Sequence, residues 1–246
     1  MLAGGALAAS APAAASSHPA GHTIHLIRPA MHGTAPMVAH GRPTNAQSTN
    51  WSGYAAHGKT YKKISASWVE PTGHCTSSQT FSSFWVGLDG FGSNTVEQTG
   101  SEVDCAGGKP RYFAWYEMFP AFPVNFSNPV SPGDHFTGSV TFTGSGHFTL
   151  VLKDTTKGWS HTIKKTLASA QRASAEVIAE APSSGGVLPL TNFGTMHFTN
   201  SLVDGTAIGS AGGVKITMVN GSGRAKDSVS ALTSSKNFSV KWLHST

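Results

Sequence analysis

Three segments in the middle of the chain combine large aromatic side chains with carboxylate and carboxamide groups. They are FWVGLDG at 84–90, VEQTG at 96–100 and YFAWYEMFP at 112–120. If each segment is a strand, the alternation of side chains puts Gln98 and Glu117 on faces that also carry apolar or aromatic residues. Polar groups among large rings would form a wet groove on an otherwise apolar sheet. The pattern alone fits equally well with core aromatics beside surface carboxylates.

Several widespread catalytic signatures are absent from the sequence. It has no GxSxG, HExxH or P-loop motif, and no GxGxxG follows a predicted strand. Asp89-Gly90 lacks the Asp-Thr-Gly or Asp-Ser-Gly form of aspartic peptidases, and no second copy exists. The members of a Ser/His/Asp triad need not be close in sequence, but no serine stands in a recognisable nucleophile setting. The histidines show no metal-ligand spacing, so no metal or cofactor is predicted.

Apolar residues recur at every second position through much of the second half of the chain. The clearest alternating runs lie at 136–142, 148–152, 214–218 and 238–242, and turn-forming sequences separate them. Short alternating strands of this kind are typical of a sandwich or barrel. One segment disagrees, because 165–181 is rich in Ala, Gln, Glu and Leu and is helical by intrinsic propensity.

The charge composition narrows the class of partner. Only 12% of the 246 residues are charged, and the formal net charge is +5. The cations are scattered, with short groupings at 59–63 and 164–165, and this argues against a nucleic-acid partner. The 12 acidic residues leave few ion pairs to be lost on protonation, so the composition is compatible with low pH.

The first 47 residues have the composition of segments that precede a folded domain. Residues 1–15 form an apolar, Ala-rich run with Ala-x-Ala sites, which predicts the remnant of a secretory signal and a secreted, extracellular protein. Residues 16–47 lack periodicity and are expected to form a disordered pro-segment or linker. The β-domain is expected at 48–246. No later run reaches the ~18 apolar residues that a membrane span needs, and we expect a monomer without a membrane partner.

The two cysteines, Cys75 and Cys105, lie in stretches rich in Gly and Ser. Cysteines of an exported protein are usually paired, although two free thiols are the alternative. A disulfide that closes a loop of about thirty residues would stabilise the fold by roughly 3–4 kcal/mol.

Seven short motifs occur in an order that resembles the glutamic peptidases, or eqolisins. They are NWSGY at 50–54, SWVEP at 67–71, FWVGLD at 84–89, QTG at 98–100, WYE at 115–117, AEVIAE at 175–180 and NFG at 192–194. Each motif is weak alone, but seven in the same order are specific. The resemblance implies an all-β fold, with two antiparallel sheets packed as a lectin-like β-sandwich of the concanavalin jelly-roll type. It also implies that 165–181 contains a strand.

The resemblance implies roles for individual residues. The glutamine before Thr-Gly and the last glutamate of Ala-Glu-x-x-x-Glu are catalytic in the family, which implies Gln98 and Glu180. The candidates for substrate binding are Trp51, Trp85, Asp89, Tyr116 and Glu117. Fungal members carry a disulfide-closed flap after the catalytic glutamate and are acidic, whereas 181–186 has no cysteine and this chain is basic. Substrate preference and pH optimum therefore do not follow from the resemblance.

A carboxylate base suits peptide hydrolysis in acid, where histidine would already be protonated. We expect Glu180 to activate a water and Gln98 to donate to the oxyanion, as in an acid endopeptidase that pepstatin does not inhibit and that cleaves polypeptides. Two alternatives stay open: a lectin-like carbohydrate-binding module, and a glycoside hydrolase with two carboxyl groups ~5–9.5 Å apart. Glu176 and Glu180 on one strand would be ~13 Å apart, which leaves cross-strand pairs such as Glu117 with Glu180.

Overall fold

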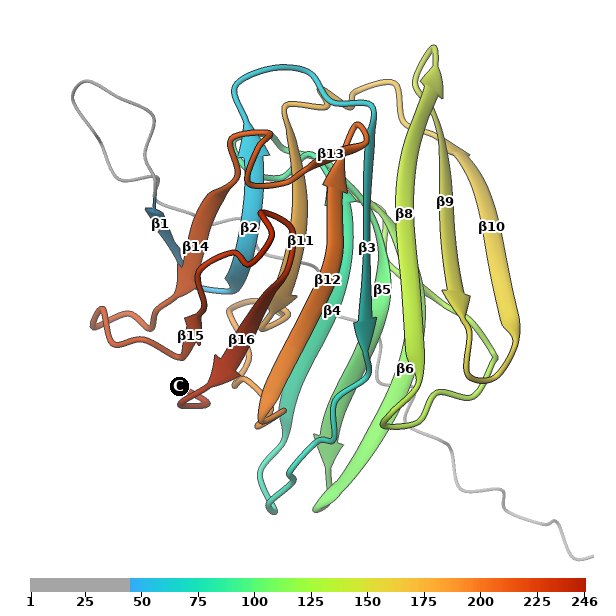
Figure 1. Cartoon of the computed structure of the whole chain (residues 1–246). Coiled ribbons are helices and arrows are strands. Elements are labelled where there is room, and N and C mark those ends of the chain that lie inside the picture. The colour runs from blue at the N-terminus through green and yellow to red at the C-terminus, as the bar shows by residue number, and fades with distance from the viewer. Residues whose placement is uncertain (1–44) are drawn as a thin grey trace, which may run out of the picture.

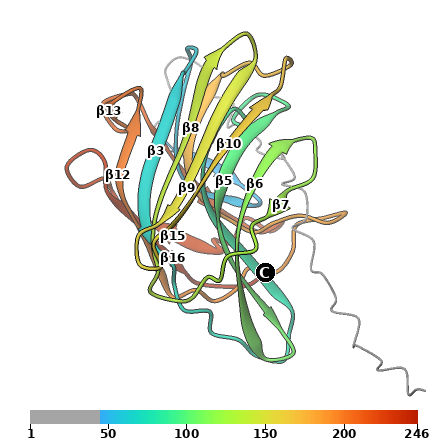
Figure 2. The same ribbon diagram turned by 90° about the vertical axis from the view of Figure 1, so that its right-hand side faces the viewer.

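The computed structural model describes residues 45–246, which form two stacked β-sheets (Figures 1 and 2). The first sheet has the strand order β1 (Asn45–Ser48), β14 (Val214–Met218), β2 (Trp51–His57), β11 (Ser174–Glu180), β4 (Thr80–Leu88), β5 (Val96–Ala106), β6 (Lys109–Phe119) and β7 (Val124–Asn125). The second has the order β10 (Trp159–Thr166), β9 (His147–Asp154), β8 (His135–Gly144), β3 (Lys63–Val69), β12 (Thr195–Val203), β16 (Phe238–Trp242) and β15 (Asp227–Val229). The short β13 (Thr206–Ala207) pairs with β12.

The main hydrophobic core lies between the two sheets. Phe84 and Val86 of β4 contribute to it from the first sheet, and Ile64 of β3 and Phe136 of β8 contribute from the second. All four are almost fully buried. Because side chains alternate along a strand, the other residues of β4 point away from the second sheet. A second apolar cluster lies on that outer face and includes Trp85.

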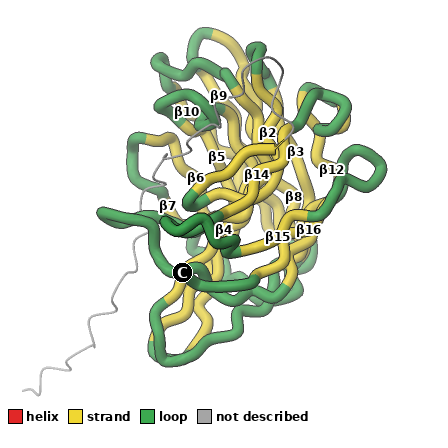
Figure 3. Tube along the Cα trace, turned by 90° about the vertical axis from the view of Figure 1, so that its left-hand side faces the viewer, coloured by secondary structure: helices red, strands yellow, loops and turns green. Residues whose placement is uncertain are grey.

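The described residues confirm the all-β sandwich. The alternating runs at 136–142, 148–152, 214–218 and 238–242 lie in β8, β9, β14 and β16. Figure 3 shows strands and loops and no helix in this part of the chain, and none of these residues forms a helix that could cross a membrane. All pairings are antiparallel except two: β1 with β14, and the isolated bridge from Phe81 to Leu190.

The helix suggested by the composition of 165–181 does not form, and that expectation was wrong. Its last residues make up β11, which pairs with β2 on one side and β4 on the other. Every residue of β11 is buried. Two neighbouring strands and a buried position on both faces therefore outweigh the intrinsic helix propensity.

The predicted disulfide is present between Cys75 and Cys105, whose Cα atoms are 5.3 Å apart. It connects the loop before β4 to the end of β5, the strand that carries Gln98. The predicted secretory signal at 1–15 lies outside the described residues, and so does the predicted pro-segment up to residue 44. Residues 45–47 belong to β1, so the folded part begins slightly before the expected position 48.

Candidate active site

The candidate residues lie in neighbouring rows on the outer face of the first sheet, which we call the site face. In one row Glu176 of β11 pairs with Gly87 of β4, which pairs with Gln98 of β5, which pairs with Glu117 of β6. Glu180 lies four residues further along β11, where it pairs with Ser83 of β4. Gln98 and Glu180 are thus two strands and four positions apart on one face, as the alternation of the strands requires.

The carboxylate of Glu180 is held at both oxygens by side-chain donors. Asn50 Nδ2 donates to Oε1 at 3.1 Å, and Trp85 Nε1 donates to Oε2 at 2.8 Å. The backbone reinforces this contact, because the Ala181 amide donates to the Asn50 carbonyl at 2.8 Å. Burial raises the pKa of Glu180 to about 7, and the donors limit that rise because they stabilise the charged form.

The Trp85 indole connects the row of Glu180 with the row of Gln98. Its nitrogen reaches Glu180, while its benzene ring lies over Gly87: a methyl group at Gly87 would be 2.8 Å from Trp85 Cζ3 and 3.2 Å from the Gln98 Cβ atom. Trp51 packs edge-on against this ring, with the ring centroids 5.0 Å apart. Only glycine leaves room for the indole between the two rows.

The amide of Gln98 is fixed by a carboxyl group. Its Nε2 atom donates to Glu117 Oε2 at 2.5 Å. Among the described residues, Gln98 Oε1 has no hydrogen-bond partner although the side chain is fully buried. One N–H and the carbonyl oxygen of this amide are therefore left for a reactant. No direct hydrogen bond joins Gln98 to Glu180 in the described part of the chain.

The site face contains more carboxyl groups than the sequence motifs suggested. Burial, and then the Asp104 carboxyl, raise the pKa of Glu102 well above its usual range, and Glu180 adds to this effect. Burial also raises the pKa of Glu176 well above the usual range. Of the twelve acidic residues in the sequence, all but Asp204 are buried. Burial thus favours the neutral form of Glu102 and Glu176 on the site face.

Two predicted binding residues occupy other positions. Asp89 ends β4 with a positive φ of 69°, and its carboxylate accepts bonds from Ser93, Thr95 and three backbone amides at 171–173. Its two oxygens thus fix the backbone of the residues that directly precede β11. Tyr116 points to the opposite face from Glu117 and stacks on Phe126 at 5.9 Å, so it lies on the other side of the sheet from Gln98. Its predicted role in substrate binding stays a prediction.

A pocket of about 230 Å³ opens beside the Glu180 end of the site. Trp51, Phe91 and Ile216 supply its apolar walls, and Asn50 connects it to Glu180. No charged side chain lines it. Its size and lining suit an uncharged side chain of a bound chain.

Sequence reasoning missed two residues of the site, Asn50 and Glu102, and considered Glu176 only as a partner of Glu180. Asn50 stands beside Trp51 in the first recognised motif, but its bond to Glu180 depends on the pairing of β2 with β11. Glu102 lies four residues after Gln98 on the same strand. The period of two already put both on one face, so that signal was available for Glu102.

Comparison with known proteins gives consistent results. The model of the Peptidase A4 family matches residues 49–242. Aspergillopepsin-2 of Aspergillus niger is 31% identical over 122 residues, which is 47% of this chain and 43% of that protein. The chain thus spans less than half the length of this curated relative.

Two solved structures are similar over most of their length. A scytalido-glutamic peptidase with a transition state analog inhibitor has a TM-score of 0.70 and 25% identity, covering 79% of this chain and 98% of the other. Aspergilloglutamic peptidase from Aspergillus niger has a TM-score of 0.60 and 25% identity, covering 67% and 99%.

Proposed function

The chain belongs to the peptidase A4 family, the glutamic peptidases, and from this premise we propose that it is an endopeptidase that cleaves polypeptides with Gln98 and Glu180. One observation carries the proposal: a buried carboxylate held by Asn50 and Trp85 lies on the same sheet face as a buried amide with unused hydrogen-bonding groups. A base and an oxyanion donor are the two groups that hydrolysis of an amide by water requires.

Glu180 acts as the general base in this proposal. Its carboxylate takes a proton from a water molecule, and the water oxygen bonds to the carbonyl carbon of the scissile peptide. Glu180 then returns the proton to the leaving nitrogen as the carbon–nitrogen bond breaks. The hydrogen bonds from Asn50 and Trp85 fix the direction of the carboxylate, so that little reorganisation accompanies the transfer.

Gln98 stabilises the oxyanion that forms in the tetrahedral intermediate. Its second N–H donates to that oxygen, and its Oε1 atom accepts a hydrogen bond from the attacking water. Glu117 holds the first N–H and so sets which end of the amide faces the reactant. A carboxamide remains a donor at every pH, which a carboxyl group does not.

The pKa values favour a mildly acidic optimum. Glu180 gains its basic form as the pH rises toward its pKa of about 7. The other buried carboxyls favour the folded state at lower pH, because they must lose protons in a desolvated environment at higher pH. We infer that activity peaks between these limits, on unfolded polypeptides outside the cell.

The test compares three proteins on denatured casein between pH 3 and pH 7, with and without pepstatin. The wild type is expected to cleave casein and to be insensitive to pepstatin. Gln98→Ala and Glu180→Gln are each expected to lose about 100- to 1000-fold or more in kcat while keeping the circular dichroism spectrum of the wild type. Near-normal turnover by either variant would refute its assigned role. Cleavage of a polysaccharide instead of casein would favour the glycoside hydrolase.

A further inference from the structure

The outer face of the second sheet carries lysines, histidines and hydroxyl groups and no carboxylate. β3, β8, β9 and β10 lie side by side (Figure 2), and their side chains alternate between core and solvent. Each of their outward positions is Ser, Thr, Lys, His or Val. We call this surface the hydroxyl–lysine face; its lysines are Lys63, Lys153 and Lys164, all exposed.

The strand register spreads these lysines widely. Lys63 pairs with Thr141, Thr141 with Thr149, and Thr149 with Lys164, so one row across four strands has a lysine at each end. At ~4.8 Å per strand, the two backbone positions are about 14 Å apart. Lys153 lies four residues along β9 from Thr149, or about 13 Å. Three ammonium groups at such distances cannot close on one small anion, whereas an extended polyanion can reach all of them.

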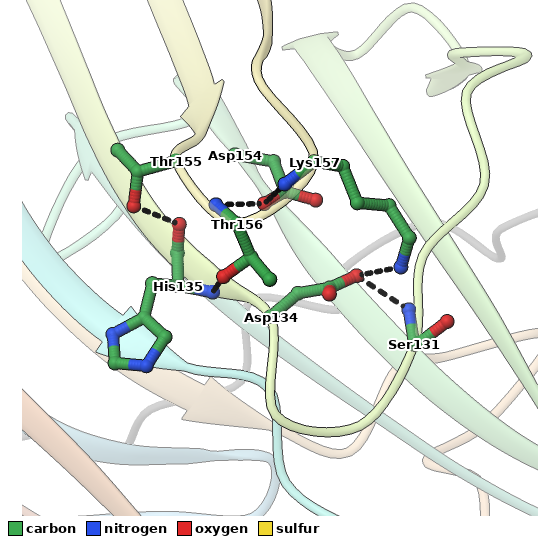
Figure 4. A network of polar contacts seen from close by, with 7 residues as sticks. All are labelled: Ser131, Asp134, His135, Asp154, Thr155, Thr156 and Lys157. Carbon is green, nitrogen blue, oxygen red and sulfur yellow. Dashed lines mark hydrogen bonds and ion pairs between the residues drawn. The ribbon is translucent and has the colours of Figure 1, made fainter.

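In the described part of the chain, no ion pair joins a nearby acidic residue to Lys63, Lys153 or Lys164. At the end of the sheet Asp134 pairs with Lys157 and accepts from the Ser131 amide, as Figure 4 shows. Asp154 accepts from the amides of Thr156 and Lys157 at 2.9 and 3.0 Å. Both carboxylates are buried.

Asp204 is the exposed carboxylate closest in the fold to this face. Its Oδ1 atom accepts from the backbone amides of Lys62 and Lys63 at 2.9 and 2.8 Å, at the very end of β3. Neither Lys153 on β9 nor Lys164 on β10 forms an ion pair with a carboxylate in residues 45–246. The field of the face is therefore positive across most of its width.

The residue types of the hydroxyl–lysine face favour one class of polyanion over another. Its outward positions include no arginine and no aromatic residue. Nucleic-acid surfaces commonly use arginine for bidentate phosphate contacts and aromatic rings for base stacking. Rows of Ser and Thr hydroxyls between the lysines can both donate and accept hydrogen bonds, which matches the hydroxyl groups of a sugar chain.

We propose that the hydroxyl–lysine face binds an anionic polysaccharide. The lysines contact the sulfate or carboxylate groups, and the hydroxyls contact the sugar rings between them. This binding uses the opposite side of the sandwich from the site face, so it is independent of the proposed peptidase activity. It would hold the protein on a polyanionic matrix while the site face stays open.

The experiment measures binding of the full chain to dextran sulfate and to neutral dextran of the same length, at several salt concentrations. The triple variant K63Q/K153Q/K164Q removes the lysines of the face. K59Q/K109Q/R111Q removes the same charge from exposed positions elsewhere. We expect the wild type to bind dextran sulfate, to release it as salt rises and to ignore neutral dextran. The face variant should lose at least tenfold in affinity, and the control variant less than threefold.

Three outcomes would overturn the proposal. Equal losses in the two triple variants would mean that net charge and not this face determines binding. No binding of dextran sulfate at low salt would remove the polyanion itself. Duplex DNA of similar charge, bound more tightly than dextran sulfate and weakened by the same face variant, would assign the face to nucleic acid. Circular dichroism and casein cleavage, unchanged in both variants, show that each is folded.

Discussion

The Trp85 indole nitrogen donates a 2.8 Å hydrogen bond to Oε2 of Glu180, across the pairing of β4 with β11. The bond is buried, and its acceptor is the carboxylate proposed as the base. A neutral donor at this position lowers the pKa of Glu180 relative to burial alone. The indole N–H group is thus one of the donors that oppose the effect of burial on the protonation of Glu180.

Replacing Trp85 with Phe removes that donor and keeps an aromatic ring. Without the N–H, burial should raise the pKa of Glu180 above its present value of about 7. The acid limb of the kcat/KM profile is then expected to move to higher pH, which a set of assays from pH 4 to pH 8 would detect. Trp242→Phe is the control, because its Nε1 atom has no partner among residues 45–246. An unshifted limb in Trp85→Phe would contradict this role.

Glu117 should act on turnover more than on substrate affinity. Its carboxyl fixes the Gln98 amide through the 2.5 Å bond, and a buried donor that loses its partner costs about 1–3 kcal/mol. Glu117→Ala is therefore expected to lower kcat by about 10- to 100-fold with little change in KM. Glu117→Gln keeps an acceptor oxygen and should recover part of the loss. If both variants retain wild-type kcat, Glu117 does not orient the amide.

A methyl group at Gly87 should damage activity through the Trp85 ring. Its Cβ atom would lie 2.8 Å from Trp85 Cζ3, so the indole must shift away from its place between the two rows. We expect Gly87→Ala to lose at least tenfold in kcat/KM. Gly221→Ala is the matched control, because nothing lies within 4 Å of a methyl group there. Equal activity in the two variants would show that the position of the indole is unimportant.

The fold should be most stable in acid. Burial raises the pKa of Glu70 to about 8 and of Glu97 to about 9, whereas both groups titrate near 4 in an unfolded chain. Between these values the folded state binds more protons than the unfolded state, so the free energy of unfolding falls as pH rises. The contribution of Glu70 and Glu97 to the free energy of unfolding is fully present below about pH 4.

Urea unfolding at pH 4 and pH 8 would measure this dependence. The midpoint for the wild type is expected to be lower at pH 8. Glu97→Gln should flatten the difference, because a neutral amide replaces a carboxyl that must ionise while buried. Asp204→Asn changes an exposed carboxylate and is the control. It should leave the difference between the urea midpoints at pH 4 and pH 8 unchanged. A wild-type midpoint that rises with pH would contradict the assignment.

The periodicity of the sequence was sufficient for most of the strands but not for β11. Runs such as 136–142 alternate because one side of each strand packs on the core and the other meets water. β11 is buried on both sides, so its sequence has no such alternation. Alanines such as Ala175 and Ala179 favour a helix by intrinsic propensity, so the sequence alone suggests one. The pairing of β11 with its two neighbouring strands outweighs that preference.

The sequence predicts which residues of one strand share a face. It does not predict contacts that depend on which strands pair with each other. Gln98, Glu117 and Glu180 share one face because their strands run in register. The bond from Asn50 joins residues 130 positions apart and has no local signal. That Tyr116 and Glu117 lie on opposite faces was predictable, because adjacent residues of a strand point to opposite faces.

The short edge strand β1 sets a limit on where the chain can be trimmed at its amino end. Ser48, its last residue, donates to Asn50 Oδ1 at 3.0 Å, and Asn50 in turn donates to Glu180. A maturation cut upstream of Asn45 would leave this relay whole. A cut inside β1 would release its parallel pairing with β14 and loosen the support of the base. A chain that begins at Asn45 is therefore expected to keep this support, and one that begins at Asn50 to lose it.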